Sequence, residues 1–186
     1  MTRKNTFALL AGTAVAFVIV AGCDNSVSGA PQPDTAPSTP SPSAANSGNP
    51  FASLDQCKIL DEILAGQGYS PATPSVADSQ RSCQAQFTST AQDKFFSITV
   101  GIALQNGQKY TDNIRDPKTS RSGKLGDRPF IEQPEPLGIA GGCQVGMSVG
   151  PNARALVIAA SGTDTAGACK KAEQVAVAVD PKLPKN

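Results

Sequence analysis

The strongest structural signal in the chain lies in residues 143–179, which read CQVGMSVGPNARALVIAASGTDTAGACKKAEQVAVAV. Apolar side chains occupy every second position from Cys143 to Val149, a spacing typical of a strand with one buried face. Gly150-Pro151-Asn152 indicates a turn, and the run from Arg154 to Ala160 indicates a second strand. The segment therefore begins with a predicted β-hairpin.

A helix is expected directly after this hairpin. Thr163 or Asp164 can cap its N-terminus, because either side-chain oxygen can accept hydrogen bonds from the first backbone N–H groups. Pro181 is expected to end the helix, since proline has no backbone N–H and clashes with the preceding turn. Its apolar stripe is narrow and consists of Cys169, Ala172, Ala176 and Val179.

The other half of the folded region begins with a predicted helix. The stretch Ser53-Leu54-Asp55-Gln56 resembles a capping box, with Ser53 as the cap. Gly66 and Gly68 are expected to end the helix, because glycine readily adopts the left-handed conformation found after helix ends. The apolar side chains that share one helical stripe are Leu54, Cys57, Leu60, Ile63 and Leu64.

Two alternating segments follow this helix. Residues 83–88 place apolar side chains at odd positions, and residues 96–104 place them at even positions. A polar turn around Gln92-Asp93 joins the two, so a second hairpin is predicted. The halves mirror each other, helix–hairpin followed by hairpin–helix. We therefore expect an α+β domain with an antiparallel sheet of about five strands and two helices.

The cysteine pattern fits this symmetry. Each half carries one cysteine on its helix and one at the start of a strand, 26 residues apart in both halves. An even number of cysteines in an exported chain implies disulfides, for which three connectivities exist. The pattern favours Cys57–Cys83 and Cys143–Cys169 among them. The alternative is a four-cysteine zinc site, but its ligands usually come in pairs two to four residues apart.

The N-terminal residues indicate where the protein is located. Arg3 and Lys4 precede an uncharged apolar run from Phe7 to Val20, which is the layout of a secretory signal peptide and too short to span a bilayer comfortably. The end of the run, Val20-Ala21-Gly22-Cys23, resembles the bacterial lipobox. That resemblance implies cleavage of residues 1–22 and lipidation of Cys23, which would anchor the protein in the membrane at its extracytoplasmic face.

A tether and a single domain make up the rest. Residues 24–50 are rich in Ser, Pro, Ala, Thr, Gly and Asn, and they cannot bury enough apolar area to offset the entropy of ordering. We therefore expect residues 23–50 to be a lipidated cysteine with a disordered tether. Residues 51–186 have the length of one ordinary domain.

These features together resemble the actinobacterial lipoproteins grouped as domain of unknown function 3558. The likeness rests on the lipobox, the tether, the stretch from Leu54 to Leu60, and Cys143-Gln144-Val145. The closing helix matches best, at Cys169, Ala172, Val175, Val179, Leu183 and Pro184. The resemblance implies two disulfides, an envelope location and no established activity.

The chain departs from this family at identifiable places. Gln56 stands where the family usually has proline before the cysteine, and Ala85 stands where tryptophan is common. The chain contains no tryptophan. The likeness is weak from Lys109 to Glu135.

Composition excludes several classes of function. The chain contains no histidine, so Ser-His-Asp triads, Cys-His dyads and histidine metal ligands are impossible. Without Arg3 and Lys4, 14 basic side chains face 15 acidic ones, which argues against a nucleic-acid partner. No Ser-x-x-Lys motif or phosphate-binding loop occurs. We expect no catalytic residue, no cofactor and no metal.

The carboxylates and glycines that stand out have plainer interpretations. Asp61 and Glu62 lie on the polar side of the first predicted helix, while Glu132 and Glu135 lie among prolines in a predicted loop. The glycine-rich residues 138–142 precede a strand rather than a helix, so they lack the geometry of an anion cradle.

A basic segment between the halves is the one unusual region. Residues 105–135 lack clear periodicity before Pro129-Phe130-Ile131, and Ser120–Lys124 is expected to be a flexible loop. One hypothesis is that the segment contacts an anionic wall polymer or lipid headgroups; the alternative is a solvated loop. The basic residues are Lys109, Arg115, Lys118, Arg121, Lys124 and Arg128.

Three hypotheses for function remain. The first is a non-enzymatic envelope lipoprotein that binds a protein, lipid, polymer or small ligand. The second is a histidine-free hydrolase or wall-modifying enzyme, which would need a Ser-Lys pair or two facing carboxylates in a pocket. The third is a structural spacer without a ligand. An apolar groove or exposed aromatic patch would favour the first.

Overall fold

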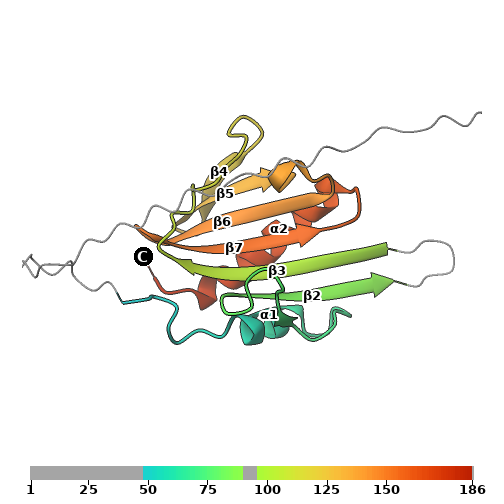
Figure 1. The fold of residues 1–186 in the computed structure, drawn as a ribbon, viewed down its shortest axis with the longest axis horizontal. Helices are drawn as coiled ribbons and strands as arrows, with labels where there is room; N and C mark the ends of the chain where they lie inside the picture. The colour runs from blue at the N-terminus through green and yellow to red at the C-terminus, as the bar shows by residue number, and fades with distance from the viewer. Residues whose placement is uncertain (1–47, 90–95, 186) are drawn as a thin grey trace, which may run out of the picture. The chain divides into compact units, whose positions relative to one another are not determined.

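The computed structural model describes residues 48–89 and 96–185 (Figure 1). These residues belong to one unit, Ala44–Asn186. The predictions for the signal peptide, for Cys23 and for the tether up to residue 47 lie outside the described residues, as does the turn at Gln92-Asp93.

An antiparallel sheet of seven strands forms the centre of the domain, in the order β1-β2-β3-β7-β6-β5-β4. Short 3₁₀ turns at Pro136–Gly138 and Asp180–Lys182 follow β5 and α2. The helices are α1 (Gln56–Leu64) and α2 (Thr165–Val179). The strands are β1 (Thr73–Pro74), β2 (Ser82–Ser89), β3 (Phe96–Asn106), β4 (Arg121–Leu125), β5 (Arg128–Pro134), β6 (Gly142–Gly150) and β7 (Ala153–Ala160).

The two predicted halves are confirmed and meet at the centre of the sheet. Strands β2 and β3 form one hairpin, and β6 and β7 form the other. Strands β3 and β7 pair with each other, with Val100 opposite Ala159 and Ile102 opposite Val157. Helix α1 packs on the first hairpin and α2 on the second, so that both cover the same face of the sheet (Figure 1). The opposite face, which we call the open face, carries no helix formed by residues 48–89 or 96–185.

The predicted sheet of about five strands is too small. Strand β1 is only two residues long, and β4 lies at the edge of the sheet with most of its side chains exposed. A strand shows apolar alternation only where one of its faces is buried, so neither of these gives a periodic signal. Strand β4 also replaces the flexible loop expected at Ser120–Lys124, because its backbone pairs with β5.

The helix caps differ in part from the prediction. Asp55, not Ser53, caps α1, and its Oδ1 accepts from the backbone N–H groups of Cys57 (2.9 Å) and Lys58 (3.0 Å). The Gln56 side chain does not reach back to Ser53 but donates to the carbonyl of Gln80 (3.0 Å). The capping-box assignment was therefore wrong by two positions, because a turn at residues 51–54 precedes the helix.

Both predicted disulfides are present. Cys57 pairs with Cys83 and ties α1 to β2, and Cys143 pairs with Cys169 and ties β6 to α2. The Cα atoms lie 5.1 and 4.9 Å apart. The two strand cysteines are at most 1% exposed. Each bond closes a loop of similar length, which on the chain-entropy account stabilises the fold by roughly 3 kcal/mol.

Helix α2 begins as one of the two predicted caps requires. Asp164 Oδ1 accepts from the backbone N–H of Gly167 (2.9 Å), so Asp164 rather than Thr163 is the cap. Alanines on the helix lie close against the sheet, because a narrow stripe of small side chains permits close approach. The fully or nearly buried residues of α2 are Ala168, Ala172, Val175, Ala176 and Val179.

Candidate functional site: a groove on the open face

Strand β7 is apolar on both faces. Ala155, Val157 and Ala159 belong to the core beneath the helices, whereas Leu156, Ile158 and Ala160 point to the open face. Ile158 is 40% exposed. A continuous apolar run such as residues 155–160 is typical of a strand covered on both faces, yet neither helix of the described part of the chain lies over the open face. The open face therefore presents apolar side chains of β7 that α1 and α2 leave uncovered.

A groove of about 230 Å³ lies over these side chains. Its floor spans β2, β3 and β7, and residues 75–82 form a wall beside it. Polar side chains of Gln84, Thr99 and Gln105 line its edges. The floor is hollow because three of its residues are small. The floor residues are Gly101, Ala103, Leu156, Ile158 and Ala160.

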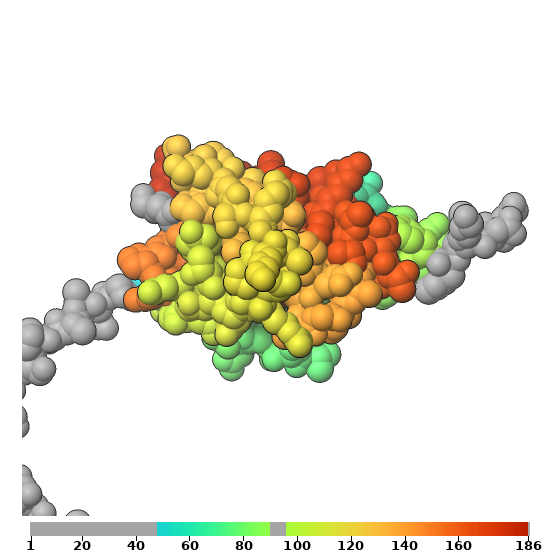
Figure 2. All heavy atoms as spheres, turned by 90° about the horizontal axis from the view of Figure 1, so that it is seen from above, coloured from blue at the N-terminus to red at the C-terminus, as the bar shows by residue number. Residues whose placement is uncertain are grey.

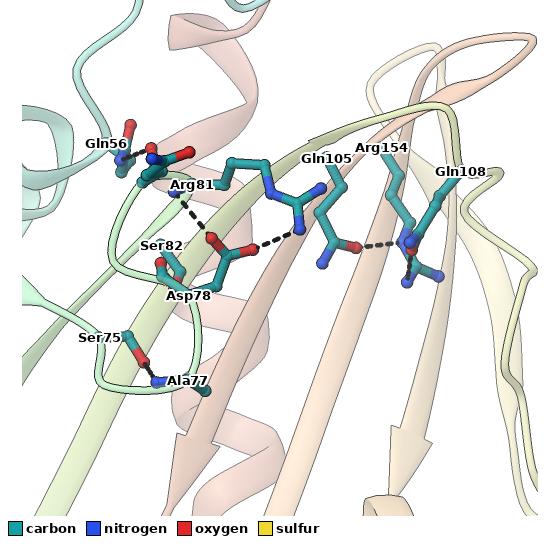
Figure 3. Close-up of polar contacts among 10 residues, drawn as sticks. Gln56, Ser75, Ala77, Asp78, Arg81, Ser82, Gln105, Gln108 and Arg154 are labelled. Atoms are coloured by element: carbon teal, nitrogen blue, oxygen red, sulfur yellow. Dashed lines mark hydrogen bonds and ion pairs between the residues drawn. The ribbon is translucent and has the colours of Figure 1, made fainter.

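The wall at residues 75–82 is held by polar contacts (Figure 3). Asp78 forms an ion pair with Arg81 (2.7 Å), and its Oδ1 also accepts from the backbone N–H of Arg81 (3.2 Å). The Ser82 hydroxyl donates to the carbonyl of Asp78 (2.6 Å). Figure 2 shows this green segment projecting from the side of the domain opposite to α1, which is teal. The wall is therefore a built feature of the open face.

Arg154 fixes the other end of the groove. Its guanidinium donates to the Gln105 side chain (2.7 Å), the Gln108 side chain and the carbonyls of Lys109 (3.2 Å) and Asp112 (2.7 Å). These contacts tie the segment after β3 down on the open face. Arg154 is only 5% exposed, and this burial lowers the pKa of its guanidinium, an effect that the charge of Asp112 opposes.

A glycine permits the same segment to lie close to β6. A side chain added at Gly146 would place its Cβ 2.8 Å from the carbonyl oxygen of Tyr110. Gly146 is buried. Residues 107–112 thus cover part of the open face and leave the groove beside them.

The six basic residues predicted to contact an anion have different surroundings. Arg128 is 7% exposed, pairs with Asp180 and donates to the carbonyls of Ser148 and Pro184, so it anchors the C-terminal residues inside the domain. Arg115 donates to the carbonyl of Leu137 (2.9 Å). Lys109, Lys118 and Lys124 are exposed. Polymer binding by the exposed members stays a prediction.

Arg121 lies on the helix side of β4. It forms ion pairs with Glu132 and Glu173, both at 3.1 Å, and lies over the ring of Phe130. These carboxylates raise the pKa of the guanidinium. Glu132 is 8% exposed and belongs to β5, so the predicted loop at this position is wrong. Its neighbours Gln133 and Pro134 pair with β6, which explains why a proline-rich stretch here is a strand.

The other carboxylates considered above have partners as well. Asp61 accepts from the backbone N–H of Ala72 (2.6 Å), and Glu135 accepts from the Thr165 hydroxyl (2.8 Å). Glu62 pairs with Lys182 (2.9 Å), and this ammonium lowers the pKa of the Glu62 carboxyl. These contacts all stabilise local structure or the docking of the C-terminus.

Two absences complete the description of residues 48–89 and 96–185. No three of their Cys, Asp and Glu side chains gather in a way that could hold a metal ion. None of their helices has both the length and the apolar character needed to cross a bilayer.

Comparison with known proteins identifies no relative of this chain. No family model, no curated protein and no solved structure matches the chain.

Proposed function

We propose that the chain is a lipid-anchored protein of the cell envelope whose domain binds a slender apolar ligand in the open-face groove, without catalysis. Lipid on Cys23 would hold it at the extracytoplasmic face of the membrane. The resemblance to the actinobacterial lipoproteins of domain of unknown function 3558 supports this address. Two disulfides also support it, since such bonds persist in oxidising compartments outside the cytoplasm.

The groove itself carries the proposal. Its floor presents apolar side chains to solvent, and its wall is fixed by the Asp78–Arg81 ion pair and the Ser82 hydroxyl. A spacer without a ligand would gain nothing from such a surface, because exposing apolar area costs solubility. An apolar floor edged by a few polar groups is typical of ligand-binding sites.

The groove lacks the groups that would favour an enzyme. Its lining includes one carboxylate, Asp78, which is paired with Arg81, and no lysine. Neither a Ser-Lys pair nor two facing carboxylates is therefore available among the lining residues. This favours binding over hydrolysis.

A neutral fluorescent dye tests the proposal. Nile red, which fluoresces when it enters an apolar site, is titrated with the exported chain carrying Cys23→Ser, so that no lipid of its own competes. Ile158→Gln places a polar amide on the groove floor and is expected to weaken dye binding by roughly tenfold, since burying an unpaired amide costs about 1–3 kcal/mol.

Val177→Gln is the matched control. Val177 is 55% exposed on α2, which covers the opposite face of the sheet. Its replacement also puts an amide in place of an apolar side chain, but away from the groove. Dye binding by this variant should equal that of the parent chain. Equal binding by the parent and Ile158→Gln chains would contradict the proposal.

A further inference from the structure

We infer that the groove takes an anionic amphiphile, an unbranched apolar chain that ends in an acid group, and that Arg81 and Gln105 hold the acid group. This inference rests on the proposed function, because it names the ligand class of the same groove.

The shape of the groove favours a single thin chain. Its volume of about 230 Å³ lies below the range of about 300–1,000 Å³ that is usual for drug-sized ligands. The groove continues along β3, because a second depression lined by Ser97 and residues 160–164 shares Thr99 and Ala160 with it. From Gln105 to Ser97 the strand extends for about 26 Å at roughly 3.3 Å per residue. A long, narrow trough whose floor over β3 and β7 is apolar suits an extended hydrocarbon chain.

The orientation of the Gln105 amide gives one end of the groove its chemistry. Gln105 Oε1 accepts from the guanidinium of Arg154 (2.7 Å). Because Arg154 can only donate, it fixes which end of the amide is oxygen and which is nitrogen. The Nε2 group of Gln105, on a residue that lines the groove, is therefore left to donate. A ligand group at this end must accept hydrogen bonds.

Arg81 supplies a second donor at the same end. Its backbone carbonyl accepts from the N–H of Leu104 (2.9 Å), which places it beside Gln105. Figure 3 shows the Arg81 guanidinium directed toward Gln105. Asp78 pairs with one of its nitrogens, Nη2, and the side chain is 53% exposed. The remaining N–H groups of this fork are the kind that bind carboxylates and phosphates.

A buried cation, Arg154, lies at this end of the groove. Arg154 is buried, and within the described residues it forms no ion pair, since its partners are amides and carbonyls. Its positive charge therefore acts through a medium of low dielectric constant. Together with Arg81 it makes two cations, matched in number by the carboxylates of Asp78 and Asp112. The preference for an acid group therefore rests on the donor groups that Arg81 and Gln105 offer at this end of an apolar floor.

Two ligands with the same hydrocarbon chain test the inference. Oleic acid and oleyl alcohol are titrated against the Cys23→Ser chain preloaded with Nile red, both below the concentration at which they aggregate. The acid is expected to displace the dye at about a fivefold lower concentration, because an exposed ion pair contributes about that much.

Gln105→Glu is the sharpest variant. The new carboxylate keeps the acceptor that Arg154 needs and pairs with its charge, so folding should be preserved, but it removes the donor and repels an acid. Oleic acid binding should fall more than tenfold, while oleyl alcohol binding stays unchanged. Arg81→Gln should weaken acid binding about three- to fivefold. Lys170→Gln, which removes one exposed positive charge from α2, should change neither.

The outcomes separate the two proposals. Acid and alcohol that bind equally, with no effect of Gln105→Glu, would overturn the anionic ligand class and leave the groove proposal standing. If neither ligand displaces Nile red from the groove, the proposed function fails as well.

Discussion

Arg154 is the residue on which the open face depends most. It belongs to β7, whose other residues are apolar. Its guanidinium donates to two glutamine side chains and two backbone carbonyls, all from residues 105–112. A guanidinium suits this role because it offers five donors in a fixed plane. One side chain thereby holds the segment after β3 and orients the amide of Gln105.

Replacing Arg154 with leucine should therefore destabilise the domain. Four acceptors lose their donor, and we expect the free energy of unfolding to fall by about 2–3 kcal/mol. Urea denaturation measures this change. Residues 107–120 should also become more sensitive to trypsin, which cleaves after Arg115 and Lys118.

Arg115→Leu provides the comparison, since it removes an exposed arginine that donates to a single carbonyl. It should cost no more than about 0.5 kcal/mol. An Arg154→Leu chain as stable as this control, and as resistant to trypsin as the parent chain, would contradict the role assigned to Arg154.

At the scale of elements, the ends of helices and the edges of the sheet deviate most from the sequence pattern. Helix α1 was predicted correctly as an element, but its first turn was not, because Ser53 and Asp55 are both good caps and a turn formed by the preceding residues decides between them. Strand β4 was not predicted, because it lies at the edge of the sheet and has no alternating apolar pattern of its own. Backbone pairing with β5 holds it in place.

The choice of cap can be tested by alanine substitution. Asp55→Ala removes the acceptor of two backbone N–H groups and should lower the free energy of unfolding by about 1 kcal/mol. Ser53→Ala should leave it within about 0.5 kcal/mol of the parent value. Urea denaturation of both variants measures these changes. A larger loss of unfolding free energy for Ser53→Ala than for Asp55→Ala would support the capping box in place of the Asp55 cap.

At the scale of the whole molecule, the domain is a sheet with one covered face and one open face. The covered face carries the core, both helices and both disulfides. The open face carries the groove, with the donor groups of Arg81 and Gln105 at one end. The domain can therefore keep a stable core on one face and present the proposed ligand site on the other.

The proposed lipid anchor can be tested on the whole protein. Cys23→Ser removes the thiol that would carry the lipid, so the chain should move from the membrane fraction to the soluble fraction of the envelope after cell fractionation. Metabolic labelling with a fatty acid should mark the parent chain alone. A parent chain that takes up no label and is soluble would refute the anchor.

The sequence alone determined which residues form the two hairpins and two helices, and which cysteines pair. These features depend on local periodicity, on turn residues and on spacing, which are properties of short segments. The length of the sheet, the Asp55 cap, the anchoring of Arg128 and Arg154 and the groove were decided by tertiary structure. Each depends on contacts between residues far apart in the chain, such as Arg128 with Asp180 or Arg154 with Gln105, and no local pattern encodes such contacts.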